Sequence, residues 1–343
     1  MSHLSRRDFL KSAGLVGAAG VFWAGRAPLL DKAWGPALAH WDGSTLGRAL
    51  LDVNTVYAQP DWRSAVLGSY KYNDLINVAG IEAGYGLYPS NNNWIKTDTG
   101  GYVYTSWVQP VANNNANPVV PIGAGGAWGE ITIPIAYSKN IPDDSTSDRE
   151  RLYYSEVYRI LGNAANDYYQ IGEVFGESFY LKASQVRVIP PEEVAPISPD
   201  VDPGAKRIEI SIRDQRLWAY EGDENVFETL VATGLPDTPT PMWTYPILDK
   251  RHGQRMIGGK TGGGYNLPGI PWINYITHTW VALHGCYWHN DYGRRHSNGC
   301  VNMLPADSKW IFRWTTPFAN YSAYSTVSGD PGVLPGTNVK IRW

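Results

Sequence analysis

The sequence has few cysteines, little net charge and no long apolar run, and each shortage excludes a class of protein. Its 343 residues include only two cysteines, Cys286 and Cys300, so disulfides do not form the framework of the fold. A net charge of −3 leaves no basic excess for binding a nucleic-acid backbone. The apolar run from Ala13 to Ala24 is roughly a dozen residues, too short to span a bilayer. We recognise no cofactor motif, and we expect neither a metal ion nor an organic cofactor.

Turn-forming and aromatic residues are abundant instead. The chain has 36 glycines, 24 prolines, 15 tryptophans and 22 tyrosines, a composition that favours short strands and many turns over long helices. Hydrophobic residues make up 43 % of the chain, which is enough for ordinary packed cores, and the length suggests two or three domains. We therefore predict a mainly β protein.

The N-terminal residues have the features of an export signal. Ser5-Arg6-Arg7-Asp8-Phe9-Leu10-Lys11 precedes the apolar run, and the two together resemble a twin-arginine signal. Ala37-Leu38-Ala39 fits a small-x-small cleavage site, so residues 1–39 are predicted to be the signal peptide. The resemblance implies recognition by the twin-arginine export machinery and a location in the cell wall, the periplasm or on the extracellular face. Cleavage and membrane retention both stay open.

Two segments of alternating apolar and polar residues follow the signal. In residues 46–112, Trp94-Ile95-Lys96 and then Gly101-Tyr102-Val103-Tyr104 resemble a bacterial Src-homology-3-like barrel, a resemblance that implies binding to the cell wall. Residues 125–190 look like a diverged second copy, in which Val186–Pro190 takes the place of the closing strand. We predict one or two small β-barrels here.

A proline-rich stretch separates these segments from the last domain. Residues 191–204 are predicted to form an extended, semi-rigid linker, and residues 205–343 the C-terminal domain. Ile208, Ile210 and Ile212 alternate with polar residues, as in a half-buried strand. Further strands are predicted at Leu217–Tyr220, Val226–Thr233, Thr279–Leu283 and Thr337–Ile341, and a helix at Pro305–Trp314.

The most informative segment is HGCYWHNDYGRRHSNGCVN, from His284 to Asn302. Gly299 before Cys300 leaves room around the sulfur, and His284 can take the thiol proton if the chain folds back. The imidazole matters because a thiol of ordinary pKa is only a few per cent thiolate at neutral pH. The segment therefore contains the minimum for a thiol nucleophile.

The S-x-G-C-V-N run at 297–302, its distance from His284 and the Thr240-Pro241 pair resemble the catalytic domain of the L,D-transpeptidases, which cross-link bacterial peptidoglycan. The resemblance implies a β-sandwich catalytic domain with one or two short helices. It also implies that Cys300 is the nucleophile and that His284 is the general base. The carbonyl of Gly285 would orient the imidazole, and backbone N–H groups around Gly299 and Cys300 would form an oxyanion hole.

The same resemblance implies a set of substrate-binding residues and reveals departures from the family pattern. The set comprises Ser297, Asn298, Asn302, Tyr265, Trp272 and Tyr287. Asn298 stands where many relatives have histidine, and Trp243 where glycine is usual. Cys286 stands where threonine is usual, and a disulfide between Cys286 and Cys300 that blocks the enzyme is one hypothesis.

The implied reaction is acyl transfer between peptide stems of peptidoglycan in the cell wall. Cys300 would form a thioester with a tetrapeptide stem, and an amine of a second stem would then form the cross-link. Water as acceptor would instead give an L,D-carboxypeptidase. Other readings are a non-catalytic cell-wall-binding protein with a degenerate transpeptidase domain, a papain-like hydrolase, and a metal site. The metal site would draw on His278, His284, His289 and His296.

Overall fold

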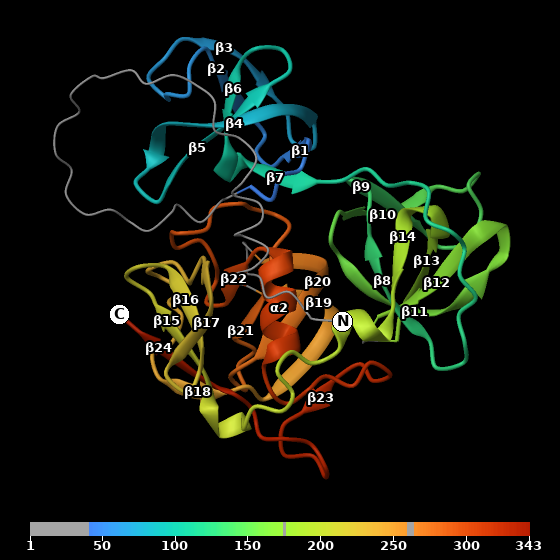
Figure 1. The fold of residues 1–343 in the computed structure, drawn as a ribbon. Coiled ribbons are helices and arrows are strands. Elements are labelled where there is room, and N and C mark those ends of the chain that lie inside the picture. Colours follow the sequence, from blue (N-terminus) through green and yellow to red (C-terminus); the bar gives the residue numbers. More distant parts are fainter. Residues whose placement is uncertain (1–40, 174–175, 259–263) are drawn as a thin grey trace, which may run out of the picture. The chain divides into compact units, whose positions relative to one another are not determined.

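The computed structural model describes residues 41–173, 176–258 and 264–343, and the predicted signal peptide lies outside these ranges. The described residues belong to one compact unit, Leu38–Trp343 (Figure 1). Strands dominate and a single α-helix occurs among the described residues, which confirms the mainly β fold class. Within this part of the chain, no helix has the length and apolar character needed to cross a membrane.

Residues 46–111, called here the N-terminal module, form an antiparallel sheet with the strand order β3-β2-β6-β5-β4-β1-β7. The predicted strands at Trp94–Lys96 and Tyr102–Tyr104 are confirmed, and Trp94 and Val103 are fully buried. The strands are β1 (Leu46–Ala49), β2 (Asn54–Tyr57), β3 (Val66–Tyr70), β4 (Leu75–Tyr88), β5 (Asn91–Thr97), β6 (Tyr102–Tyr104) and β7 (Val108–Val111).

Residues 127–189, the middle module, repeat this architecture. The strand order β10-β9-β13-β12-β11-β8-β14 matches that of the N-terminal module strand for strand, as expected for an internal repeat. In both modules a 3-10 turn precedes the last strand, at Thr105–Trp107 and at Ala183–Gln185. The likeness to Src-homology-3 barrels and the domain limits remain predictions. The strands are β8 (Ala127–Ile131), β9 (Ile135–Lys139), β10 (Asp148–Tyr153), β11 (Val157–Ala164), β12 (Tyr168–Gly172), β13 (Ser178–Lys182) and β14 (Val186–Ile189).

The proline-rich segment differs from the extended spacer that its composition predicts. It contains two 3-10 turns, Pro191–Val194 and Pro203–Ala205. Glu193 forms ion pairs with Arg187 of the middle module and Lys309 of the C-terminal domain. The start of the segment is therefore bound to both neighbours through the side chain of Glu193, while most of its residues are exposed or half-buried.

The C-terminal domain is a sandwich of two five-stranded sheets with one helix. The first sheet has the order β17-β16-β15-β24-β18 and the second β22-β21-β20-β19-β23. The first comprises β15 (Lys206–Ser211), β16 (Arg216–Glu221), β17 (Glu224–Leu230), β18 (Thr244–Pro246) and β24 (Asn338–Arg342). The second comprises β19 (Asp249–Gly258), β20 (Tyr265–Tyr275), β21 (Ala282–Gly285), β22 (Val301–Met303) and β23 (Thr326–Val327). The helix is α2 (Pro305–Trp314), as predicted.

Alternating side chains of both sheets form the core of this domain. Ile208 and Ile210 from β15 pack with Leu283 and Val301 from the second sheet, and all four are fully buried. Helix α2 contributes Ile311 and Trp314 to the same cluster.

Two buried lysines hold the C-terminal end of helix α2. Lys250 donates hydrogen bonds to Phe312 O and Thr315 O, and Lys206 donates to Trp314 O. Ammonium groups suit this position because the last carbonyls of a helix have no partners within it and carry partial negative charge. The helix is thereby fixed against β20 and β21.

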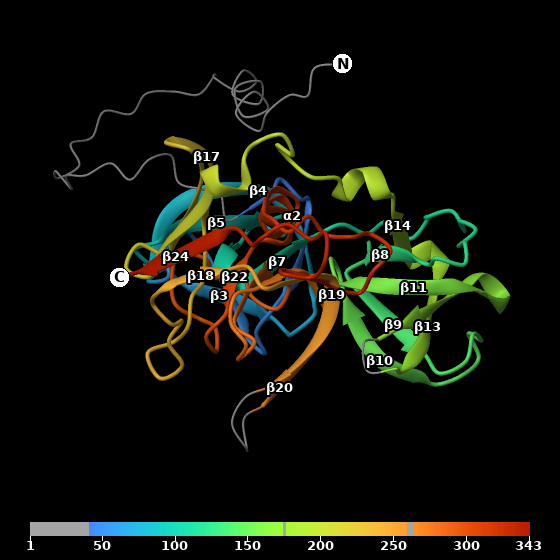
Figure 2. The ribbon, with the colours of Figure 1, turned by 90° about the horizontal axis from the view of Figure 1, so that it is seen from below.

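The hairpin of β19 and β20 lies against β11 of the middle module (Figure 2). A Cβ on Gly253 would lie 2.1 Å from Val157 O. A Cβ on Gly269, whose φ is +53°, would lie 2.7 Å from Glu156 Cβ. Side chains at these two positions would push the hairpin away, so glycine permits the close approach.

Candidate active site

Strands β21 and β22 run parallel and bring the two ends of the His–Cys motif together. Leu283 pairs with Val301, and His284 pairs with Asn302. Because side chains alternate along a strand, the inward direction of Leu283 and Val301 turns His284 and Asn302 to the opposite face. Cys300 lies two residues before Asn302 and therefore faces the same side.

A cavity of about 220 Å³ lies on this face. It contains both Cys300 and His284, and the β19–β20 hairpin supplies one of its walls. The lining residues are Met256, Tyr265, Leu267, Ile270, His284, Trp288, His296, Ser297, Asn298, Cys300 and Asn302. The structure thus gathers six residues predicted for the site: Cys300, His284, Ser297, Asn298, Asn302 and Tyr265.

The loop before the nucleophile is shaped by hydrogen bonds to small polar side chains. Gly299 has φ +117°, a backbone conformation that favours glycine, and its carbonyl accepts a bond of 2.9 Å from Thr240 Oγ1. Ser297 Oγ donates to Cys300 O (2.5 Å) and accepts from the N–H of Gly299 (3.1 Å). The Gly299 N–H is therefore already committed, although it was expected to serve an oxyanion hole.

The imidazole of His284 has a defined tautomer. Its Nδ1 lies 2.9 Å from Gly285 O, and since a carbonyl can only accept, Nδ1 carries the proton. Nε2 then has a lone pair, which accepts a 3.1 Å hydrogen bond from Asn302 Nδ2. Burial lowers the pKa of His284 to about 4, so the ring is neutral at neutral pH.

The thiol of Cys300 is half-buried and lies 3.8 Å from Trp280 O. Burial raises the pKa of this thiol to about 11. Since the pKa of the imidazole is lowered and that of the thiol is raised, the neutral pair is the resting form. The site differs in this respect from a preformed thiolate–imidazolium ion pair.

Two of the predicted substrate-binding residues are not brought to this cavity. Trp272 is fully buried, and its ring centroid lies 5.5 Å from that of Phe312, in a cluster that includes Trp128 of the middle module. Tyr287 is also buried, and its hydroxyl donates to Pro268 O at 2.7 Å. Trp288, the next residue, lines the cavity instead.

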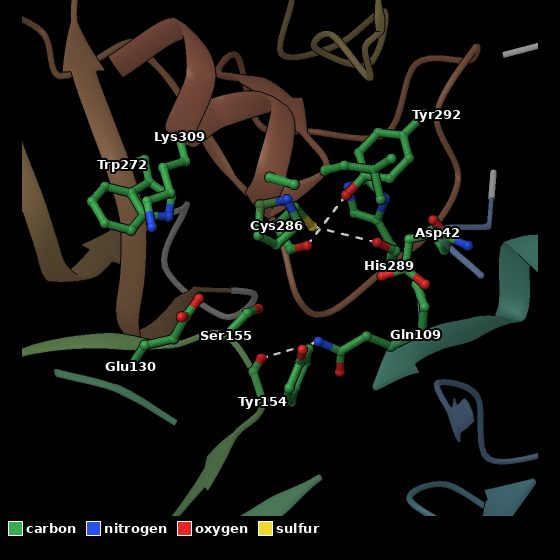
Figure 3. Close-up of a pocket in the computed structure, with 15 residues that line it drawn as sticks. Asp42, Gln109, Glu130, Tyr154, Ser155, Trp272, Cys286, His289, Tyr292 and Lys309 are labelled. Atoms are coloured by element: carbon green, nitrogen blue, oxygen red, sulfur yellow. Dashed lines mark hydrogen bonds between the residues drawn. The ribbon is translucent and has the colours of Figure 1, made fainter. Parts of the chain in front are cut away.

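Cys286 lies in a different environment from Cys300, and both are free thiols. Cys286 is buried, its sulfur is 3.6 Å from His289 O, and burial raises its pKa to about 12. It lines a second cavity of about 260 Å³, shared with residues of both modules (Figure 3). In the described ranges, no three His, Cys, Asp or Glu side chains gather as ligands for a metal ion.

Two further residues that shape the site were assigned no role from the sequence. Thr240 was noted only as part of a Thr-Pro pair, yet it joins Gly234 N and Gly299 O. His289 was considered as a ligand of a metal site, yet it bonds to Asn302. Their roles depend on contacts between distant segments, so local sequence gives no signal beyond the presence of polar side chains in a glycine-rich region.

Comparison with known proteins covers the C-terminal domain and the N-terminus. Residues 205–341 match the family described as L,D-transpeptidase catalytic domain. Residues 3–23 match the signal sequence of the twin-arginine translocation pathway. A curated relative, the "Putative L,D-transpeptidase YciB" of Bacillus subtilis (strain 168), is 21 % identical over 127 residues, which are 33 % of this chain and 63 % of that protein. The match thus spans less than two thirds of the relative's length.

Solved structures with likeness to the chain include two L,D-transpeptidases. The catalytic domain of the E. faecium enzyme has a TM-score of 0.32 and 24 % identity, covering 40 % of this chain and 98 % of its own. The enzyme from Mycobacterium smegmatis has a TM-score of 0.33 and 16 % identity, covering 54 % of this chain and 82 % of its own. These likenesses are distant, and the assignment of residues 205–341 rests on the family match.

Proposed function

Since residues 205–341 match the L,D-transpeptidase catalytic domain and residues 3–23 match a twin-arginine signal sequence, we propose that the protein is exported and transfers acyl groups between peptidoglycan stems. Cys300 is the nucleophile and His284 the general base. The observation that carries the proposal is that both side chains line one cavity, held by paired strands of the matched domain. The neutral resting pair suits a base that takes the thiol proton only during attack.

In the first half-reaction, Cys300 Sγ attacks the carbonyl carbon of the L–D peptide bond in a tetrapeptide stem. The thiol proton moves to Nε2 of His284, from which the amide of Asn302 has to withdraw. When the tetrahedral intermediate collapses, the C–N bond breaks and the imidazolium returns the proton to the departing amine of D-alanine. A thioester on Cys300 remains.

In the second half-reaction, an amine of another stem attacks the thioester carbonyl and His284 removes its proton. The C–S bond then breaks, the new amide forms the cross-link and the sulfur regains a proton. Because Gly299 N–H is bonded to Ser297 Oγ, we assign the oxyanion contact to the N–H of Cys300. Transfer to water would yield the carboxypeptidase reaction at the same site.

The hairpin side of the cavity is the proposed place for the donor stem. Tyr265, Leu267 and Met256 provide an apolar wall, and Trp288 lies on the side of the motif loop. Ser297 and Asn302 are proposed to act mainly by holding the loop and the base, because their side chains are already bonded within the protein. Asn298 is exposed at the cavity and is free to contact a bound stem.

Incubation with a carbapenem followed by intact-mass measurement tests the proposal. A carbapenem is an acyl donor, so we expect a single adduct located on Cys300 by peptide mapping. The variant Cys300→Ala should form none, and His284→Ala should acylate about two to four orders of magnitude more slowly. A wild-type protein that is folded but never acylated would favour the wall-binding alternative, and full reactivity of His284→Ala would refute the base assignment.

A tetrapeptide stem offered with and without an amine acceptor distinguishes the transferase from the carboxypeptidase. The transferase should release D-alanine and form a cross-linked product whose yield rises with acceptor concentration. A carboxypeptidase would release the same amount of D-alanine and give only tripeptide.

A further inference from the structure

A chain of hydrogen bonds leads from His284 to a second buried histidine. Asn302 donates from Nδ2 to His284 Nε2 (3.1 Å), and its Oδ1 lies 3.0 Å from His289 Nε2. His289 is 5 % exposed and also lines the cavity of about 260 Å³ behind the site, where Figure 3 shows it close to Cys286 and Tyr292. The amide of Asn302 thus bridges the two imidazoles.

The direction of each bond follows from what the partners can donate. Asn302 Oδ1 can only accept, so Nε2 of His289 must carry a proton. The other nitrogen of His289, Nδ1, then has a lone pair, and it accepts the N–H of Asp291 at 3.2 Å. The two histidines are therefore held in opposite tautomers, with the proton on Nδ1 in His284 and on Nε2 in His289.

We propose that His289 is a positioning residue that fixes the amide orientation of Asn302 and so keeps Nε2 of His284 unprotonated. This inference deepens the proposed function and rests on the role of His284 as the base. With Asn302 fixed, its N–H group faces the base. If the amide were reversed, Oδ1 would face His284 and would stabilise a proton on Nε2.

The consequence for the reaction is a short-lived imidazolium. Once the Asn302 amide has withdrawn and Nε2 of His284 has taken the thiol proton, the amide N–H nearby offers this proton no acceptor, because both groups are donors. The proton is then passed readily to the leaving amine. The low proton affinity of the base makes uptake of the thiol proton unfavourable at rest, so the proton is held only until the leaving amine takes it.

The loop that carries His289 is held by the N-terminal module. Asn290 Nδ2 donates to Thr105 O (3.1 Å), and Arg48 Nη2 donates to Tyr287 O (2.8 Å). The Arg294 guanidinium lies 3.6 Å from the ring centroid of Tyr88. These contacts flank His289 on both sides, so the module fixes the position from which His289 reaches Asn302.

The charged and titratable groups around His289 come from several elements. Its own loop provides Asp291, which pairs with Arg294 (2.8 Å), and His296, whose ring centroid is 4.0 Å from that of His289. His284 lies beyond Asn302. The remaining charged residues of the cavity are Asp42, Glu130 and Lys309. Burial lowers the pKa of His289 to about 3, so its ring is neutral at neutral pH.

Nuclear magnetic resonance of the full protein labelled with ¹⁵N-histidine tests the tautomers directly, without any need for activity. Long-range ¹H–¹⁵N spectra at neutral pH should show an Nδ1–H ring for His284 and an Nε2–H ring for His289. His278, which is exposed, serves as the reference for a ring in exchange with solvent. An Nδ1–H tautomer at His289 would overturn the proposal.

The variants His289→Leu and His289→Gln test the coupling. Leucine removes the donor to Asn302 Oδ1, so the amide is free to turn and His284 should gain about tenfold in proton affinity, moving its titration up by roughly one pH unit. Glutamine keeps an N–H donor and should restore the wild-type titration. The acid limb of carbapenem acylation should follow the same order, with the limiting acylation rate lowered in His289→Leu and the apparent affinity for the carbapenem little changed.

The outcomes separate this proposal from the proposed function. An unshifted His284 titration in a folded His289→Leu variant would refute the coupling, even if Cys300 is acylated normally. Failure of the wild-type protein to acylate would refute the proposed function, whereas the tautomers would still be measurable. If His289→Leu does not fold, the wild-type tautomers and the titration of His289→Gln decide the question.

Discussion

The side chain of Cys300 gains its proposed reactivity during the reaction and not at rest. Burial raises its pKa to about 11, while the pKa of His284 is lowered to about 4. A thiolate on Cys300 would have no positively charged partner at rest, because the imidazole of His284 is neutral. Between these two pKa values both groups keep their neutral forms, so the proposed catalytic state is available over a wide pH range.

Alkylation of Cys300 by iodoacetamide should therefore be slow at pH 7. Because only the thiolate reacts, the rate should rise nearly tenfold per pH unit up to about pH 10, without a plateau near neutrality. The measurement uses Cys286→Ala, so that the modified sulfur is that of Cys300. A rate that levels off below pH 8 would show a low thiol pKa and would contradict the neutral resting pair.

The sequence predicts the place of some residues at the cavity correctly and that of others incorrectly. Cys300, His284 and Ser297 belong to one short motif, and the structure gathers all three at one cavity. Trp272 and Tyr287 were equally plausible as aromatic residues for the site, but both are buried and neither lines the cavity. Tyr287 and Trp288 are neighbours in an irregular loop, where only the folded backbone decides which side chain lines the cavity. Trp272 lies on β20 and packs with Phe312 and Trp128.

Among the elements, the β19–β20 hairpin links the cavity to the middle module. Arg255 on β19 bonds to Glu150 (2.6 Å) and Glu173 (2.9 Å) of that module, and also to Asn266 of β20 (2.8 Å). Its side chain is 9 % exposed, and that of Glu173 6 %. One face of the hairpin is thereby held by charge pairs, while residues of the same hairpin line the cavity.

Replacing this guanidinium should weaken both the fold and substrate binding. Arg255→Met leaves two partly buried carboxylates without their cation, which should cost about 3–5 kcal/mol of unfolding free energy. The hairpin then loses a support, so KM for the donor stem should rise severalfold with a smaller change in kcat. Denaturant titration and steady-state kinetics measure the two effects.

The matched control is Arg63→Met, which removes an exposed pair with Asp61. Its effect on stability should be small because the pair is exposed to solvent, and KM should not change. Equal effects of the two substitutions would mean that Arg255 has no special role in holding the hairpin.

The elements themselves were more predictable than their packing. The helix at Pro305–Trp314 and the strands around Ile208 and Leu217 follow from apolar periodicity and a suitably placed proline. The proline-rich segment was predicted from composition alone to be extended, but it contains two 3-10 turns, and its role as a linker stays a prediction. Glu193 near its start forms ion pairs with Arg187 and Lys309. These pairs depend on how the two neighbouring parts are folded, which local sequence does not show.

For the molecule as a whole, Arg48 connects all three parts of the described chain. It is 1 % exposed on β1 and donates to Gln109 Oε1 (2.7 Å) within its own module and to Tyr287 O (2.8 Å) in the C-terminal domain. Its guanidinium also lies 4.1 Å from the ring centroid of Tyr153 in the middle module. The partners are far apart in sequence, so no pattern within a module predicts this junction.

Residues 41–343 should therefore unfold in one cooperative thermal transition. Arg48→Met should leave the polar groups at the junction unpaired, at a cost of about 1–3 kcal/mol, and should broaden or split the transition. Differential scanning calorimetry measures this effect. Arg151→Met is the control, because Arg151 is exposed and lies over Tyr137 within one module. A wild-type scan with three separate peaks would contradict the cooperative junction.

Strand β24 has a consequence for how the protein is made. It lies between β15 and β18, and Arg207 pairs with Asn338, so two segments separated by almost the whole C-terminal domain are direct neighbours. Until β24 is synthesised, β15 presents an open edge, a known template for aggregation, and pairing over such a distance is slow. Because the twin-arginine route carries folded proteins, translation must be nearly complete before the cargo is fit for transport. Premature termination upstream of Asn338 would then leave the product in the cytoplasm, exposed to proteases.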